Sequence, residues 1–184
     1  MIKFGLKKKI RPVNRLDRNT SGLVIFAKCE YIQECLSKQM LNKSFKKEYI
    51  AIVSGKFANT EKSGTINLPI ARKENSIIER CINKDGQKAI THYEVIKQYN
   101  KYSLVKCSLE TGRTHQIRVH LSHLGHPIYG DTLYGIEEDA QLISRQALHA
   151  YGLNFKSPRT KEYLQLRADL PEDIRALLEN LRES

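Results

Sequence analysis

The strongest signal for the architecture lies in residues 89–110, AITHYEVIKQYNKYSLVKCSLE. Residues 89–97 and 102–110 both have the composition of β-strands, with many β-branched and aromatic side chains. Only residues 98–101 separate the two segments. Two strand-like segments joined by so short a connection predict an antiparallel hairpin.

Elements on either side of this hairpin complete the predicted fold. From composition and turn residues we expect further strands at 23–27 (a buried apolar run), 47–53, 65–70, 147–156 and 162–167. From apolar spacing and helix-stop signals we expect helices at 30–42, at 114–124 and after Pro171. Strands outnumber helices and alternate with them only loosely. The sequence therefore predicts an α+β fold with a mixed, mainly antiparallel sheet and flanking helices.

The charge of the chain indicates its partner. The 184 residues suit one domain, and 31 Lys and Arg against 20 Asp and Glu give a formal net charge of +11. Such a field favours a polyanion, and no basic amphipathic helix of the membrane-surface type stands out, so nucleic acid is the leading candidate over a merely basic domain. No apolar run approaches the ~20 residues of a membrane span. Four cysteines without a Cys-x-x-Cys pair indicate reduced thiols and a cytoplasmic protein.

Four histidines crowd into residues 115–126: His115, His120, His123 and His126. A zinc-dependent hydrolase would need three or four ligands that converge on one point, with a general base beside them. This stretch contains no Cys or Glu, and Gly125 is expected to end the helix before His126. We therefore expect no metal site and favour a structural or RNA-contacting role for these histidines.

Two segments are dense in side chains capable of chemistry. In the first, residues 14–22, Asp17 lies between Arg15 and Arg18. Nearby positive charge keeps a carboxylate ionised and available as a nucleophile or a base, although a salt-bridged turn explains the same pattern. In the second, residues 110–120, a glycine precedes a predicted helix whose N-terminal amides could meet a phosphate. The alternative there is an ordinary amphipathic helix with solvated arginines.

Taken together, these segments resemble one family. Arg-Leu-Asp-x-x-Thr-Ser-Gly at 15–22, Lys-x-Tyr-x-Ala at 47–51 and Gly-Arg-Thr-His-Gln-Ile-Arg-Val-His-Leu at 112–121 resemble the RluA-type family of RNA pseudouridine synthases. Gly-His-Pro-Ile at 125–128, Gly-Asp at 130–131 and Leu-His-Ala at 148–150 match the same family in the same order. The resemblance extends from about residue 11 to about residue 170.

The resemblance implies a reaction and its residues. These enzymes isomerise uridine in RNA to pseudouridine without a cofactor or metal. By resemblance, Asp17 is the catalytic carboxylate, acting either as nucleophile or as base. Arg118 is the basic partner that pairs with it, and Tyr49 is the tyrosine that stacks on the uracil ring and can assist loss of the C5 proton. The RNA-binding residues expected from sequence are Arg15, which could fill the space left by a flipped base, and Arg18, Arg113 and His115.

The sequence departs from the family in two places. Asn14 replaces the usual histidine before Arg-Leu-Asp, so an orienting role survives and an acid–base role does not. Only 13 residues precede Asn14, where the family carries a longer segment and often an S4-type RNA-binding domain. We therefore expect residues 1–184 to form a single catalytic domain without an S4 domain, N-terminally incomplete or else a short form of the family. We expect it to be monomeric and to act on ribosomal or transfer RNA. The alternative is a non-catalytic RNA-binding domain that retains the fold.

Overall fold

The computed structural model describes residues 9–137 and 142–182. Its α-helices are α1 (Glu30–Leu41), α2 (Gln116–His123) and α3 (Glu172–Arg182), and η1 (Asn59–Glu61) is a short 3-10 helix. The longer strands are β4 (Lys46–Ser54), β5 (Ser63–Asn67), β8 (Ile90–Gln98), β9 (Tyr102–Leu109), β10 (Leu148–Lys156) and β11 (Tyr163–Arg167). The short strands are β1 (Arg11–Pro12), β2 (Ser21–Gly22), β3 (Phe26–Ala27), β6 (Ile70–Arg72) and β7 (Arg80–Ile82).

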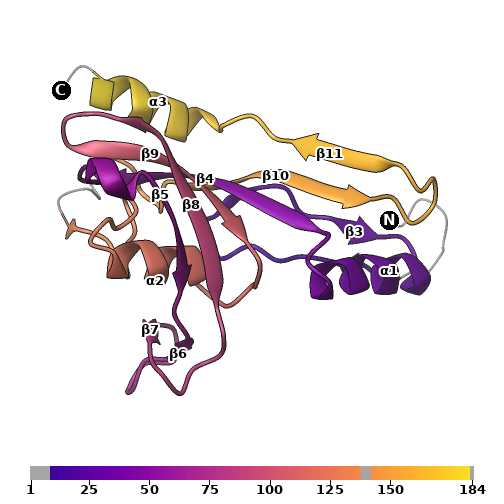
Figure 1. The fold of residues 1–184 in the computed structure, drawn as a ribbon. Coiled ribbons are helices and arrows are strands. Elements are labelled where there is room, and N and C mark those ends of the chain that lie inside the picture. The colour runs from indigo at the N-terminus through magenta and orange to yellow at the C-terminus, as the bar shows by residue number, and fades with distance from the viewer. Residues whose placement is uncertain (1–8, 138–141, 183–184) are drawn as a thin grey trace.

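The long strands form one sheet in the order β11-β10-β4-β9-β8-β5, with β2 added parallel to β10. All the other pairings in this sheet are antiparallel, and β8 and β9 form the hairpin that the sequence predicted. Figure 1 shows α2 and α3 on opposite sides of the sheet. The prediction of an α+β fold with a mixed, mainly antiparallel sheet is confirmed.

The centre of the sheet is β4, which is covered on both faces. Its side chains from Tyr49 to Ser54 are all buried, because successive residues of a strand point to opposite sides and both sides carry a helix. The predicted apolar stripe of α3 closes one side, and each of its members is buried: Ile174, Leu177, Leu178 and Leu181. On α2, Ile117 and Leu121 belong to the same core.

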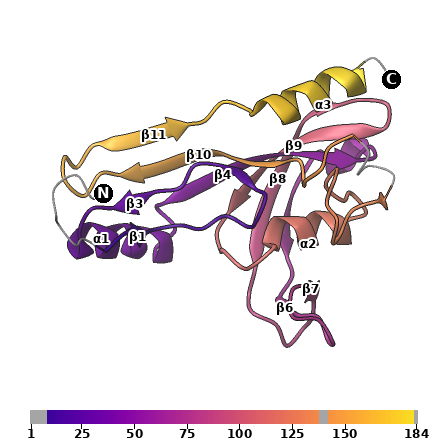
Figure 2. The ribbon, with the colours of Figure 1, turned by 180° about the vertical axis from the view of Figure 1, so that it is seen from behind.

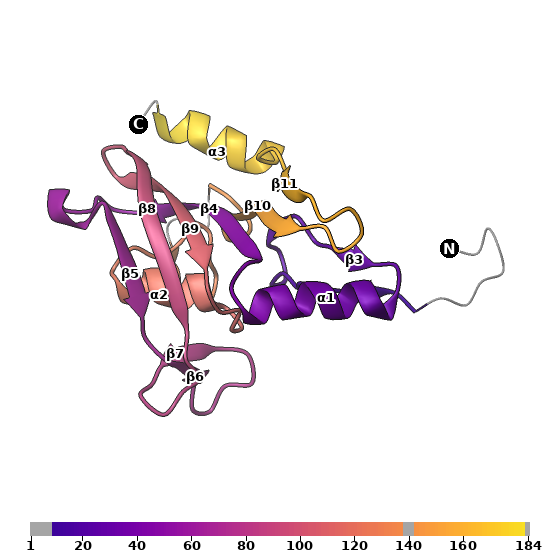
Figure 3. The same ribbon diagram turned by 45° about the vertical axis from the view of Figure 1, so that its right-hand side comes forward.

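A second, smaller core lies at the other end of the molecule, under α1 (Figure 3). Leu36 of α1 packs there with Phe45 and Phe155, whose rings stack at 5.2 Å. The prediction of a buried strand at 23–27 is wrong. Phe26 is 56% exposed, and only Phe26 and Ala27 of this segment belong to a strand, the short β3 that pairs with β1. The reason is that its alternate residues pack under α1 while the others face outward, as at an edge.

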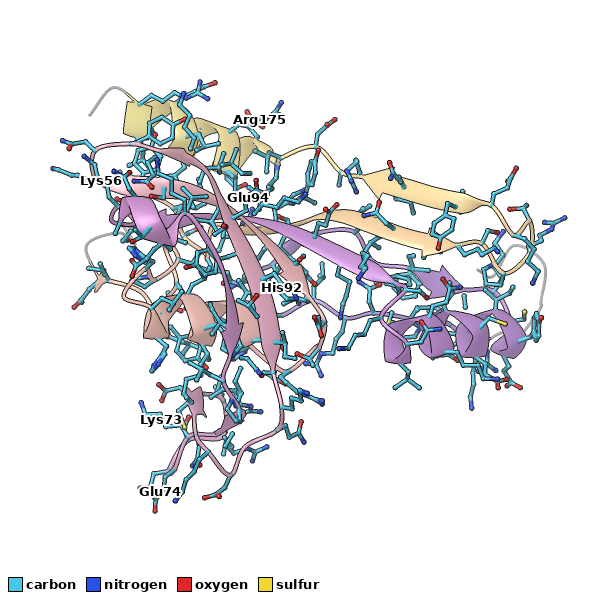
Figure 4. All side chains as sticks on the ribbon, viewed as in Figure 1. Lys56, Lys73, Glu74, His92, Glu94 and Arg175 are labelled. Atoms are coloured by element: carbon cyan, nitrogen blue, oxygen red, sulfur yellow. The ribbon has the colours of Figure 1, made fainter. Side chains whose placement is uncertain are left out.

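An arm extends from the sheet between β5 and β8. Its two short strands, β6 and β7, pair with each other apart from the main sheet (Figures 1 and 2). Lys73 and Glu74 lie at its far end (Figure 4). The strand expected at 65–70 is divided here, because Pro69 cannot donate a backbone hydrogen bond. None of the helices in the described ranges is both long and apolar enough to cross a membrane.

Candidate active site

A cleft of about 620 Å³ opens between the N-terminal loop, the end of α1, β4 and the turn after β9. In Figure 2 the loop between β1 and β3 reaches from the α1 side toward α2. The cleft brings together segments that lie far apart in sequence, including the catalytic candidates Asp17 and Tyr49 and the RNA-binding candidates Arg15 and Arg113. Its charged lining residues are Arg15, Asp17, Lys43, Lys47, Glu110 and Arg113.

The loop that carries Asp17 is anchored against the start of β10. Gln146 Nε2 donates to Thr20 Oγ1 at 3.0 Å. Gly22 lies so close to β10 that a Cβ at this position would come within 2.3 Å of the Ala150 carbonyl oxygen. Its φ of +115° also favours glycine. The Leu-His-Ala motif at 148–150, at the start of β10, therefore holds the loop that carries Asp17 in position.

Asn14 braces the other end of this loop. Its Nδ2 donates to the Leu23 carbonyl at 3.1 Å, and its Oδ1 accepts from the Ile25 amide at 2.8 Å. A side-chain amide can donate and accept at once, which this double contact requires. The orienting role expected for Asn14 is thus a contact with the protein's own backbone.

The negative charge of Asp17 acts on three neighbouring groups. It contributes to raising the pKa of Tyr49, and it opposes the lowering of the His115 pKa. It also contributes to raising the pKa of Arg118. Asp17 is partly exposed and lines the cleft together with Tyr49 and with residues of the turn before α2. The two functional segments of the sequence therefore meet at one place.

Tyr49 contributes a protonated phenol to the cleft. Burial, with the charge of Asp17 adding to it, raises the pKa of Tyr49 to about 12. At neutral pH the phenolate is therefore scarce, about one part in 10⁵, since each pKa unit is a factor of ten. Tyr49 is suited to stacking and to hydrogen bonding as a neutral group, rather than to acting as a ready base.

Arg118 is buried and bound to Asp131. Its Nε and Nη2 donate to the two oxygens of the Asp131 carboxylate, both at 2.6 Å. We expected Arg118 to pair directly with Asp17, but the ion pair recorded in the described part of the chain is with Asp131. The physical reason is burial: the Asp131 side chain is fully enclosed and needs a cation, whereas Asp17 is open to solvent in the cleft.

Two predicted RNA-binding residues lie outside the cleft lining. His115 Nδ1 is 2.9 Å from the Tyr134 hydroxyl. Burial and the charge of Arg118 lower the pKa of His115, which favours its neutral form. Arg18 is exposed beside the aspartate loop, with its side chain on the surface.

The turn before α2 is organised by a buried glutamine that was not expected to matter. Gln116 Oε1 accepts from the Arg113 amide at 3.0 Å and from Thr111 Oγ1 at 2.8 Å. Its Nε2 donates to the Ile90 carbonyl at 3.0 Å. The helix begins at Gln116 rather than at 114, because His115 has a left-handed φ of 58°.

Two further histidines of this cluster, His120 and His126, have structural partners. His120 is fully buried; its Nε2 donates to the Leu68 carbonyl at 3.0 Å, and its Nδ1 lies 2.9 Å from Thr91 Oγ1. His126 stacks on Phe57 at 3.7 Å. Within residues 9–137 and 142–182, no three His, Cys, Asp or Glu side chains are grouped as a metal site requires.

Sequence reasoning assigned no role to Asp131, Gln116 or Tyr134. Asp131 was visible only as part of a Gly-Asp pair after a turn, and its partner could not be identified. Tyr134 lies with its ring 5.1 Å from the Arg118 guanidinium carbon, and its hydroxyl accepts from the Arg80 amide at 2.7 Å. The signal available in the sequence was that Asp131 is an isolated acid among apolar residues. A buried carboxylate needs a cation, so such an acid indicates a buried basic partner.

Comparison with known proteins assigns this arrangement to a family. The sequence profile of the RNA pseudouridylate synthases matches residues 2–123, so the chain belongs to that family, as its motifs predicted. It is 42% identical over 182 residues to the uncharacterized RNA pseudouridine synthase YlyB of Bacillus subtilis, covering 98% of this chain and 59% of that protein. It is 40% identical over 177 residues to the ribosomal large subunit pseudouridine synthase D of Nitrosomonas europaea, covering 92% and 51%.

A solved structure shares the fold. The human RNA pseudouridylate synthase domain containing 1 superimposes with a TM-score of 0.75 at 25% sequence identity, over 96% of this chain and 81% of that one. By comparison, the chain spans only 51–60% of the length of curated relatives such as YlyB, YjbO and synthase D.

Proposed function

We propose that this protein isomerises uridine in RNA to pseudouridine, with Asp17 as the catalytic carboxylate. The observation that carries the proposal is the convergence of the two motif segments: Asp17 lies in a cleft with Tyr49, and its charge acts on the buried Arg118. The names of the relatives support the same activity.

The reaction redistributes bonds within one nucleotide. The N1–C1′ glycosidic bond breaks, the uracil turns, and C5 bonds to C1′. The proton lost from C5 balances the proton gained at N1, so no electron or group enters or leaves. Asp17 acts either as a nucleophile or as a base at the sugar. Tyr49 stacks on the uracil as a neutral phenol, and Arg118 supplies a fixed positive charge near the carboxylate.

The target uridine must leave its helix to reach Asp17. Base flipping costs a few kcal/mol, which contacts between basic side chains and phosphates can offset. Arg15 is exposed at the cleft, two residues before Asp17, and is positioned to fill the space of the flipped base. Arg18, Arg113 and His115 contribute further RNA contacts in this proposal.

The substrate is ribosomal or transfer RNA, and the names of relatives such as the Nitrosomonas europaea enzyme favour ribosomal RNA. We expect the protein to act in the cytoplasm, where these RNAs occur, and as a monomer. We propose that it needs no cofactor or metal, because the isomerisation involves no redox or group transfer.

The test is tritium release from RNA labelled at C5 of uridine. The wild-type protein should release tritium, and Asp17→Asn should lower the rate by at least about 100-fold. Asp169→Asn, an exposed aspartate outside the cleft lining, is the matched control and should retain the rate. Equal release by wild type and Asp17→Asn would remove Asp17 from the mechanism.

The second candidate is a non-catalytic RNA-binding domain that retains the fold, and the formal net charge of +11 favours its binding to RNA. It requires RNA affinity that falls steeply with salt but no tritium release from any RNA. Quantitative release by the wild type would exclude it.

A further inference from the structure

Lys47 occupies a special position within the cleft. It lies two residues before Tyr49 on β4, so the two side chains project from the same face of the strand. Both line the cleft that contains Asp17. Their positions along the strand are roughly 7 Å apart. A group bound at Lys47 would therefore adjoin a ring stacked on Tyr49.

The ammonium of Lys47 has no carboxylate partner among the described residues, although two glutamates are near it in sequence or register. Glu48 points to the other face of β4, where it pairs with Lys106 at 2.7 Å and Arg167 at 2.9 Å. Glu110 pairs with Lys43 at 2.5 Å and lies 2.8 Å from His92. Both acids are therefore engaged elsewhere.

The group that does act on Lys47 is another cation. Burial, with the charge of Arg113 adding to it, lowers the pKa of Lys47. Two positive groups placed together without an acid between them destabilise the empty cleft. An anion bound between them would remove that penalty.

Arg113 is held in place beside Lys47 by the protein. Its amide donates to the Gln116 side chain, and its Nε donates to the Lys88 carbonyl at 3.1 Å. Gly112 provides the room for the close approach: a Cβ there would lie 3.2 Å from Lys47 Nζ. The turn thus leaves space for the ammonium, and Arg113, the residue after Gly112, lines the same cleft as Lys47.

We infer that Lys47 and Arg113 together bind the phosphate adjoining the flipped uridine. Lys47 is then a positioning residue that fixes the location of the target nucleotide relative to Asp17. This inference rests on the proposed function. It separates Lys47 from its neighbour Lys46, which is exposed and points to the opposite face of the strand.

The test is the binding of a fluorescent oligoadenylate with one central uridine, measured by anisotropy at several KCl concentrations. Lys47→Met should weaken binding roughly tenfold, as expected for a lost charged hydrogen bond. It should also reduce the slope of log affinity against log salt by about 0.7, the value for one single-strand phosphate. Lys46→Met removes the same charge and should leave the slope unchanged.

A neutral methylphosphonate linkage next to the uridine sharpens the assignment. It should weaken binding by the wild type and leave the affinity of Lys47→Met unchanged, whereas a distant neutral linkage should affect both proteins equally. Equal losses in both proteins at the adjoining linkage, or no measurable binding by the wild type, would overturn the inference. Binding is measured with Asp17 intact and does not require turnover. A failure of this inference can therefore be distinguished from a failure of the protein to isomerise uridine.

Stability distinguishes this role from a structural one. Lys47→Met removes an unpaired, half-buried charge and should raise the urea midpoint of unfolding. Lys47→Arg should keep the wild-type salt slope. A lowered midpoint of Lys47→Met with an unchanged salt slope would show that Lys47 has only a packing role. If Lys47→Met does not fold, two measurements replace it: the salt slope of Lys47→Arg and the effect of the adjoining methylphosphonate on binding by the wild type. A changed slope for Lys47→Arg, or no effect of that linkage, would then overturn the inference.

Discussion

Arg118 and Asp131 form a two-point ion pair inside the protein, with both nitrogen–oxygen distances at 2.6 Å. The side chains are 5% and 0% exposed, so the pair is shielded from water. Asp131 Oδ1 also accepts from the Leu133 amide at 3.0 Å. The orientation of Arg118 is therefore set by the protein, and its charge is in place near Asp17 before any substrate binds.

Breaking this pair should destabilise the fold strongly. Asp131→Ala leaves the Arg118 guanidinium buried without its carboxylate, and the expected cost is about 3–5 kcal/mol of unfolding free energy. Urea denaturation measures it. Lys73→Ala breaks the exposed Lys73–Glu79 pair of the arm (Figure 4) and should change the midpoint little. Similar midpoints for the two variants would contradict the structural importance of the buried pair.

Tyr49 should make stability sensitive to alkaline pH. Its folded-state pKa of about 12 exceeds the ordinary value of 10, so the folded state holds the proton more tightly. The resulting stabilisation is fully present below pH 10 and is lost as the pH rises toward 12, by about 3 kcal/mol in all. Tyr49→Phe cannot ionise, so its unfolding free energy should fall less steeply between pH 8 and pH 11.

The control for this measurement is Tyr163→Phe, because Tyr163 is 74% exposed. It should follow the wild-type pH dependence. If Tyr49→Phe also follows the wild-type curve, the Tyr49 phenol is not the buried group described here.

Gly22 should tolerate no side chain, in contrast to Gly125. Both have a positive φ, +115° and +81°. A Cβ at Gly22 would collide with the backbone of Ala150, whereas a Cβ at Gly125 would meet no atom within 4 Å. Gly125→Ala should therefore cost about 1 kcal/mol in backbone strain, and Gly22→Ala should cost several times more.

Activity provides a second readout for these glycines. Gly22→Ala should displace the Asp17 loop and abolish tritium release, even at a temperature where circular dichroism shows a folded protein. Gly125→Ala should retain release. Retained release by a folded Gly22→Ala protein would show that the contact with β10 does not position Asp17.

Glu110 should restrain RNA binding by occupying a basic side chain of the cleft. Hydrogen bonds from Lys43 and His92 lower the pKa of Glu110 to about 2, so it remains ionised at any ordinary pH. Glu110→Gln leaves the Lys43 ammonium available to a phosphate. RNA affinity at low salt should rise several-fold, and the salt slope should steepen by about 0.7.

Glu34→Gln is the matched control. It releases Lys38 from an exposed pair of 2.7 Å on α1, outside the cleft lining. RNA binding by this variant should match the wild type. If both variants gain the same affinity, the effect is one of net charge and not of the cleft.

Much of the fold could be predicted because local patterns agree with it. The hairpin of β8 and β9, the helix α1 and the stripe of α3 each follow from periodicity within one segment. The prediction of a buried strand at 23–27 was wrong because it also relied on local composition alone. Composition shows that these residues are apolar, but it does not show that Val24 and Phe26 lie at an edge where one side stays exposed.

The sequence alone was sufficient for the family, the sheet class and four of the side chains that line the cleft, Arg15, Asp17, Tyr49 and Arg113, since motifs and strand composition are properties of short segments. The partner of Arg118, the unmatched charge of Lys47 and the support of the Asp17 loop by β10 depended on the folded chain. Each of these arises from burial and from contacts between residues distant in sequence, and the free energy of a charge depends on what surrounds it in space rather than along the chain.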